Sequence, residues 1–114
     1  MLLIRIAERD GEIKVIDISK HVQPDDDDDL YRLICAGVSC VATGLCNVLD
    51  QLCPECCEIS FDSDEGDPDQ PNFISIRAVK ASPELQTILK TGKIQLQCAW
   101  ESYSQYIDYK ITEV

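Results

Sequence analysis

The most constraining feature of this sequence is a long run without a charged residue, LICAGVSCVATGLCNVL, which extends from Leu33 to Leu49. Its length and its leucine and alanine content favour a helix over a strand, and we expect the helix to end near Leu52. The run is shorter than the roughly 20 apolar residues that cross a membrane, and it contains Ser39, Thr43 and Asn47, so we do not predict a membrane span. A helix that is apolar on nearly all sides must be buried on nearly all sides. We therefore expect a sheet against one face and, in a homodimer, a second copy of the chain against the other.

Two strands are predicted before this helix. Apolar residues occupy alternate positions from Leu2 to Ala7, and the segment from Ile13 to Ile18 is again apolar and β-branched. The Asp10-Gly11 pair between them tolerates the positive φ of tight turns, which predicts an antiparallel hairpin. The alternation in the second strand shifts between Val15 and Ile16. That shift indicates either a bulge or a strand covered on both faces, and we favour the covered strand.

The second half of the chain contains two more alternating segments, a helix start and a final strand. Cys57 to Asp62 and the segment around Ile74 and Ile76 are predicted as strands, joined by the acidic loop SDEGDPDQP. Ser82-Pro83-Glu84 supplies an N-cap, a first-turn proline and an early acid, so a second helix should start there. Tyr106 to Ile111 is predicted as the last strand. The order ββαββαβ predicts one domain over residues 1–114, an α+β two-layer sandwich with two helices on a mostly antiparallel sheet.

Charge and cysteine content limit the classes of partner. The formal net charge is −11, which repels a phosphate backbone, so we expect no direct binding of nucleic acid and instead favour a basic protein or peptide. The first residues lack the order of charged and apolar segments that defines a secretory signal, and a cytoplasmic location is expected. Seven cysteines are an odd number and suggest no disulfide framework, so reduced thiols are expected.

Two residues suggest chemistry. His21 follows the second predicted strand, and Cys35 lies within the first turn or two of the uncharged helix. The positive end of the helix dipole and a nearby imidazolium would both stabilise a thiolate, and the histidine would remove and return the proton, as in cysteine peptidases. Two other interpretations are a buried structural cysteine and an inert surface histidine. The aspartate run that ends at Asp29 would oppose the thiolate if it folded over the helix start.

A second group of cysteines lies in the stretch CPECC. Cys53, Cys56 and Cys57 would supply part of a zinc site, but four ligands are needed and the sequence has no second such pair, although folding could recruit Cys98 and His21. A redox pair is expected to open a helix after a strand, whereas this motif follows a helix. No metal site is therefore predicted.

The residues from His21 through LICAGVS resemble the ribosomal-processing cysteine protease family (Prp), in which a histidine after the second strand precedes a variable loop and a helix that begins cysteine-alanine-small-residue-serine. Cys35-Ala36-Gly37-Val38-Ser39 matches that pattern position by position. The resemblance implies a homodimeric α/β peptidase with a cysteine–histidine dyad and no cofactor. Members of the family remove a short N-terminal extension from large ribosomal subunit protein twenty-seven, and they cut after an aromatic residue.

The resemblance also assigns roles to individual residues. Cys35 would be the nucleophile and His21 the general base and acid, while Ser39, one turn beyond Cys35, would support the thiol or the bound peptide. Backbone N–H groups at the helix start are candidates for an oxyanion site. Lys20 and Arg32 stand where members have glycine and aspartate; Arg32 would support the thiolate or pair with the aspartate run. The alternative function is a non-catalytic dimeric module that binds a basic ribosomal or assembly partner.

Overall fold

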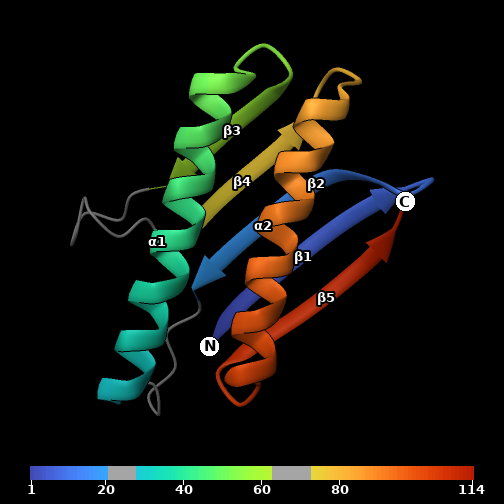
Figure 1. Ribbon diagram of the computed structural model, residues 1–114. Helices are drawn as coiled ribbons and strands as arrows, with labels where there is room; N and C mark the ends of the chain where they lie inside the picture. Colours follow the sequence, from blue (N-terminus) through green and yellow to red (C-terminus); the bar gives the residue numbers. More distant parts are fainter. Residues whose placement is uncertain (21–27, 63–72) are drawn as a thin grey trace.

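The computed structural model describes residues 1–20, 28–62 and 73–114. Within these residues the elements follow the predicted order ββαββαβ (Figure 1). The predicted strands and helices are all present, and the helices are longer than their apolar cores because each includes a polar first turn. The elements are β1 (Leu2–Arg9), β2 (Glu12–Lys20), α1 (Asp29–Leu52), β3 (Cys57–Asp62), β4 (Phe73–Ala78), α2 (Pro83–Ser102) and β5 (Ile107–Glu113).

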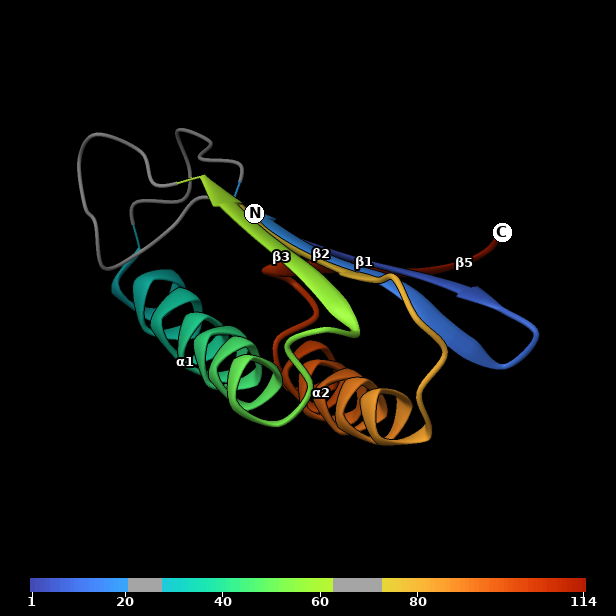
Figure 2. The same ribbon diagram turned by 90° about the horizontal axis from the view of Figure 1, so that it is seen from above.

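The five strands form one sheet in the order β3-β4-β2-β1-β5. All neighbours are antiparallel except β1 and β5, which pair in parallel. Both helices cover the same face of this sheet, and no described helix covers the other face (Figure 2). The predicted two-layer sandwich with a mostly antiparallel sheet is therefore confirmed.

The hairpin between β1 and β2 also confirms the prediction, but the second strand differs from it. Asp10 and Gly11 have φ values of 52° and 80°, as a two-residue turn with positive φ requires. Ala7 pairs with Val15, whereas Glu8 pairs with Ile13, so β2 contains one extra residue at this point. The shift in alternation is thus a bulge, and the expectation of a strand covered on both faces is wrong because the helices lie on one face only.

Helix α2 stabilises this bulge through one side chain. The backbone N–H of Ile13 donates to Gln86 Oε1 over 2.7 Å, and Gln86 Nε2 donates back to the carbonyl oxygen of Ile13 over 2.9 Å. A bulge leaves backbone groups without a partner in the ladder, and an unsatisfied buried group is costly. The glutamine supplies both missing partners and so attaches α2 to the sheet.

The two helices pack tightly where Leu45 of α1 meets Gly92 of α2. Gly92 is buried, and a Cβ atom at this position would lie 2.6 Å from Cδ2 of Leu45. At that distance the Leu45 side chain would have to shift to admit a Cβ atom, so the glycine that interrupts the apolar stripe of α2 allows the helix contact as it stands. The residues of the core that α1 and α2 contribute are Tyr31, Ile34, Cys35, Val38, Ala42, Leu45, Leu49, Leu85, Leu89 and Leu96.

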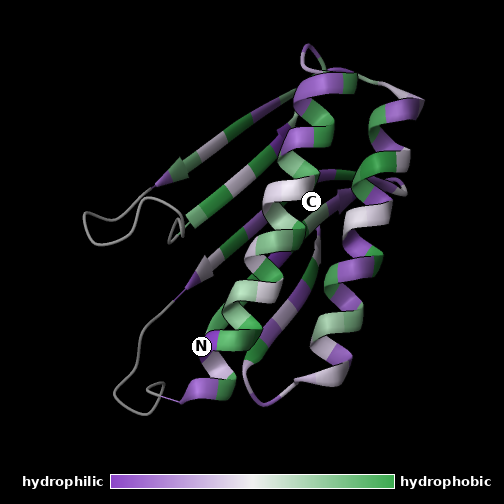
Figure 3. Ribbon diagram, turned by 60° about the vertical axis from the view of Figure 1, so that its left-hand side comes forward, coloured by the Kyte–Doolittle hydropathy of each residue, from purple (hydrophilic) through white to green (hydrophobic). Residues whose placement is uncertain are grey.

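Helix α1 is apolar on its outer side as well as on its buried side (Figure 3). Leu33 is 70% exposed, and Val48 and Leu52 are also exposed. By length and composition α1 is apolar enough to cross a membrane, a test that core helices also pass. In this fold one side of α1 packs on the sheet and on α2, so the apolar outer side is the part left without a partner in a single chain.

Candidate active site

Cys35 lies in the second turn of α1, as predicted, and its side chain is buried. It is the seventh residue of a helix that begins at Asp29, and only 5% of its surface is exposed. Its sulfur forms no disulfide. The helix dipole acts mainly within the first turn, so its effect is reduced at Cys35. The N–H groups of the first turn lie about 4.5 to 9 Å from Cys35 along the helix axis.

The start of α1 is capped by Asp28, a member of the aspartate run. Asp28 Oδ1 accepts a hydrogen bond from the backbone N–H of Leu30 over 2.9 Å. The backbone carbonyl oxygen of Asp28 accepts one from the backbone N–H of Arg32 over 3.1 Å. Asp28 Oδ2 accepts from the hydroxyl of Tyr106 over 3.0 Å. This hydrogen bond, more than burial, raises the pKa of Tyr106. At least this part of the acidic run therefore folds over the helix start, whereas residues 25–27 lie outside the described residues.

Ser39 lies one turn beyond Cys35 and faces the end of strand β2. It lines a small cavity of about 10 Å³ together with Ser19 and Lys20, the last two residues of that strand. The structure therefore brings the Ser39 flank of α1 against the point where the chain leads into His21. His21 itself lies outside the described residues. The cavity is completed by Leu2, Ile18, Ala42 and Ile74.

Arg32 is exposed on α1, and its Nη1 atom lies 3.8 Å from Oδ1 of Asp29. Both side chains of this ion pair are well exposed, and such pairs contribute little to stability. Of the two roles that the sequence suggested for Arg32, pairing with the aspartate run is the one for which a contact is seen.

The second group of cysteines forms a turn between α1 and β3. The backbone N–H of Cys56 donates to the carbonyl oxygen of Cys53, and the Cys57 thiol contacts the same oxygen. Burial is the main cause that raises the pKa of Cys53 and Cys57, and it raises that of Cys46 to about 11. Thiols with raised pKa values are poor nucleophiles at neutral pH. Among the described residues, no three His, Cys, Asp or Glu side chains are grouped to hold a metal ion.

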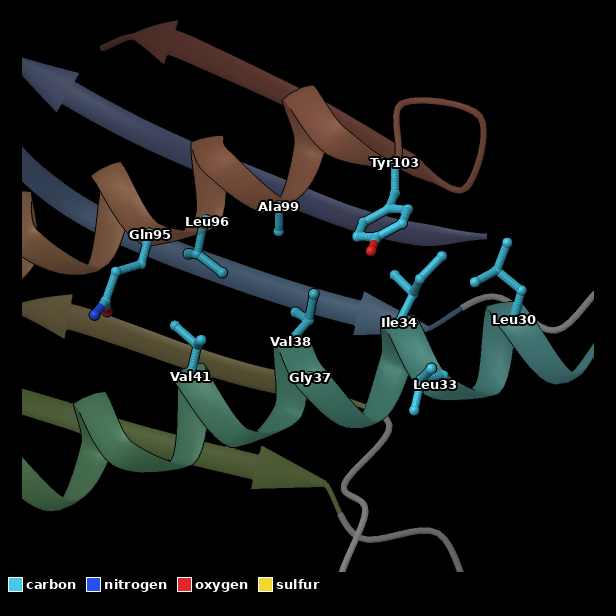
Figure 4. Close-up of a pocket in the computed structure, with 10 residues that line it drawn as sticks. All are labelled: Leu30, Leu33, Ile34, Gly37, Val38, Val41, Gln95, Leu96, Ala99 and Tyr103. Carbon is cyan, nitrogen blue, oxygen red and sulfur yellow. The ribbon is translucent and has the colours of Figure 1, made fainter.

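Sequence reasoning did not find an apolar groove between the two helices (Figure 4). Its two parts, of about 280 and 500 Å³, share Val41 of α1 and Gln95 of α2. Ile34 and Val38 point from α1 toward α2, and Tyr103 closes one end. Because α1 turns by about 100° per residue, Val41 lies on the flank opposite Ser39. Neither Cys35 nor Ser39 lines the groove.

Comparison with known proteins identifies the family. The family model described as cysteine protease Prp matches residues 1–108. The chain belongs to the Prp cysteine protease family. No curated protein matches the chain in sequence.

Solved structures agree with the assignment to Prp. The ribosomal processing protease Prp from S. aureus, in complex with a substrate peptide, has a TM-score of 0.80 and 26% identity, over 98% of this chain and 100% of that one. The structure of the same enzyme with a covalently linked product peptide has a TM-score of 0.74 and 26% sequence identity, and the match covers 100% of each chain. The protein SMU.848 from Streptococcus mutans gives 0.77 at 19% identity, over 100% of this chain and 96% of that one, which shows the fold alone. Membership of Prp makes this chain a cysteine peptidase by family.

Proposed function

We propose that this chain is a cytoplasmic cysteine endopeptidase that removes a short N-terminal extension from a large-subunit ribosomal protein, protein twenty-seven. Cys35 is the nucleophile and His21 is the general base and acid. Two structures of the S. aureus relative support a peptide substrate, since one contains a substrate peptide and the other a covalently linked product peptide. A covalently held product is what nucleophilic catalysis generates.

The observation that carries this proposal is the small cavity that Ser39 lines together with the end of β2. Strand β2 ends at Lys20, which lines the same small cavity as Ser39. His21 is the next residue in the chain, and Cys35 precedes Ser39 by one helical turn. The strand that leads to the proposed base and the helix that carries the proposed nucleophile therefore meet at this point.

The proposed reaction divides the work between two side chains. His21 takes the proton of the Cys35 thiol, and the sulfur attacks the carbonyl carbon of the scissile bond. His21 then returns the proton to the leaving amine as the carbon–nitrogen bond breaks, which leaves a thioester. Water activated by His21 hydrolyses the thioester and restores the thiol. Because only 5% of Cys35 is exposed, the side chains around it must move apart before a peptide carbonyl reaches the sulfur.

The homodimer is part of the same proposal. A chain with a net charge of −11 repels a second copy of itself, so self-association needs a face without acids. The outer side of α1 is such a face, since no charged residue occurs from Leu33 to Leu49 and the groove beside it is apolar. The acidic remainder of the surface favours a basic peptide as substrate.

The burial of Cys35 favours a second candidate function. A thiol enclosed in the core is more often structural than reactive. In this case the chain would be a non-catalytic dimeric module that holds a basic ribosomal or assembly partner by its acidic surface.

One experiment separates the two functions. Purified wild-type protein is incubated with peptides that have an aromatic residue before the cut site, and the products are identified by mass spectrometry. We expect Cys35→Ala to reduce the rate by at least about 1,000-fold, and the matched variant Cys98→Ala, which removes an exposed thiol of α2, to leave it unchanged. The same samples are treated with iodoacetamide at neutral pH. Slow labelling of Cys35 together with no cleavage by the wild type would support the non-catalytic module and contradict the peptidase.

A further inference from the structure

The start of α1 is attached to a distant part of the chain through a single tyrosine. Tyr106 lies in the turn between α2 and β5, and its hydroxyl donates to Asp28 Oδ2 over 3.0 Å. The other carboxylate oxygen of Asp28 already caps α1 through the N–H of Leu30. One carboxylate therefore joins the helix start to Tyr106.

Tyr106 is itself fixed by backbone hydrogen bonds. Its N–H donates to the carbonyl oxygen of Tyr103 over 3.0 Å, and its own carbonyl oxygen accepts from the N–H of Leu2, also over 3.0 Å. The first of these bonds ties it to the end of α2, and the second ties it to the start of β1. The hydroxyl of Tyr106 thus extends from a rigid point at the edge of the sheet layer.

A second contact strengthens this attachment. The ring of Tyr106 lies 6.0 Å from the ring of Tyr31, with an angle of 33° between the planes. Tyr31 is the buried residue of the first turn of α1, while Asp29, Leu30 and Arg32 beside it are exposed. Among the residues of this turn, Tyr31 is therefore the one that packs against the fold, and it lies one helical turn before Cys35.

We propose that Tyr106 is a positioning residue, which fixes the first turn of α1 through Asp28 and Tyr31 and so sets the direction of the Cys35 sulfur. The inference rests on the proposed role of Cys35. A nucleophile that is displaced by about 1 Å from its path of attack loses roughly 100-fold in rate, so the rigidity of the helix that carries it matters to turnover. A hydrogen bond to a carboxylate is stronger than one between neutral groups and suits this purpose.

The test uses the full chain with Tyr106→Phe, which keeps the ring against Tyr31 and removes only the hydroxyl. We expect kcat for peptide cleavage to fall about 10-fold with KM within about twofold of the wild type, since the peptide still binds but the sulfur is less well aimed. The backbone amides of Leu30 and Arg32 should exchange with deuterium about 10-fold faster because the first turn opens more often. The matched control is Tyr109→Phe in β5, whose ring stacks on Trp100 at 5.2 Å; kcat and the exchange rates of the Leu30 and Arg32 amides should both be unchanged in this variant.

Asp28→Asn provides a second measurement. Asparagine caps helices nearly as well as aspartate and still offers an oxygen to Tyr106, but it removes the charge from the bond. A loss of about threefold in kcat is expected, and the double variant Asp28→Asn/Tyr106→Phe should be no slower than Tyr106→Phe alone, since both changes act through one bond. If the loss of kcat in the double variant equalled the product of the losses in the two single variants, the inference would be contradicted.

The outcomes also separate this inference from the function on which it rests. Unchanged kcat in an active enzyme carrying Tyr106→Phe would overturn the positioning role. Absence of cleavage by the wild type would instead refute the proposed function, and amide exchange then decides alone. Unchanged exchange at Leu30 and Arg32 would overturn the attachment, and faster exchange would uphold it.

Discussion

The two helices lie side by side on the same sheet face but differ in what their outer sides present (Figures 2 and 3). The solvent side of α2 carries charged residues such as Glu84, Lys90 and Glu101, and Lys93 pairs with Glu8 of β1. The outer side of α1 carries none between Leu33 and Leu49. The outer side of α2 is thus largely polar apart from Ile94, whereas the outer side of α1 is largely uncharged and apolar.

This difference shows that charge distribution distinguishes two kinds of buried helix. Helix α2 has one apolar stripe, and a single sheet face satisfies it. Helix α1 has a second apolar side that the sheet and α2 do not cover, and the groove of Figure 4 opens on that side. Exposed apolar area of this kind marks an interaction surface.

The contact between the helices gives the largest expected effect. Leu45→Ala should lower the free energy of unfolding by about 3 kcal/mol through the cavity it leaves. Gly92→Ala should cost about 1–2 kcal/mol, because its Cβ would overlap Cδ2 of Leu45. In the double variant the overlap disappears, so its cost should be smaller than the sum of the two. Urea denaturation measures the free energy of unfolding of all three variants, with the exposed Lys90→Ala as a neutral control. If the costs of the two single substitutions simply added up in the double variant, the overlap between residues 45 and 92 would be refuted.

The outer sides of the two helices are compared by placing one charge on each. Leu33 of α1 and Ile94 of α2 are 70% and 62% exposed. Leu33→Lys should weaken the proposed homodimer by at least about 100-fold in Kd, because the charge would be buried between the copies. Ile94→Lys should leave Kd unchanged. Sedimentation velocity over a range of protein concentrations measures the dimer Kd of both variants. If the two substitutions changed Kd equally, the outer sides of the two helices would not differ in their role in the dimer.

The smallest expected effect concerns the two N-caps. Ser82 caps α2 by accepting from the N–H of Leu85 over 3.2 Å, and Asp28 caps α1 in the same way. Ser82→Ala should cost about 1 kcal/mol. Asp28→Ala should cost more than this, because the hydroxyl of Tyr106 also loses its acceptor. Thermal unfolding of both variants at one protein concentration provides the comparison, and equal costs would mean that the bond from Tyr106 contributes nothing to stability.

Much of the fold was predictable because local patterns determine it. The alternation of Cys57 to Asp62 and the Ser82-Pro83-Glu84 start have one reasonable structural interpretation each, and both are confirmed. The bulge in β2 could not be predicted in the same way, because the choice between a bulge and a doubly covered strand depends on which face of the sheet the helices cover. That choice is a property of packing rather than of the strand sequence.

The site was predictable only in part. The pattern around Cys35 predicts a helix that carries a thiol, and the structure confirms the helix but shows the thiol buried. Ser39 lies on the expected face. The bond between Asp28 and Tyr106 has no local signal, because the two residues are 78 positions apart and neither forms a motif with its neighbours. Contacts of this kind follow from tertiary structure alone.

The parallel pairing of β1 with β5 affects how the chain folds during synthesis. Residues Leu2 and Ile107, about a hundred positions apart, are partners in this ladder. Pairing across so long a loop slows folding. The β1–β2 hairpin leaves the ribosome with one flank of β1 unpaired until β5 has emerged, and an open strand edge of this kind attracts other chains. The edge of β1 is therefore open to pairing with other chains until the last strand is made.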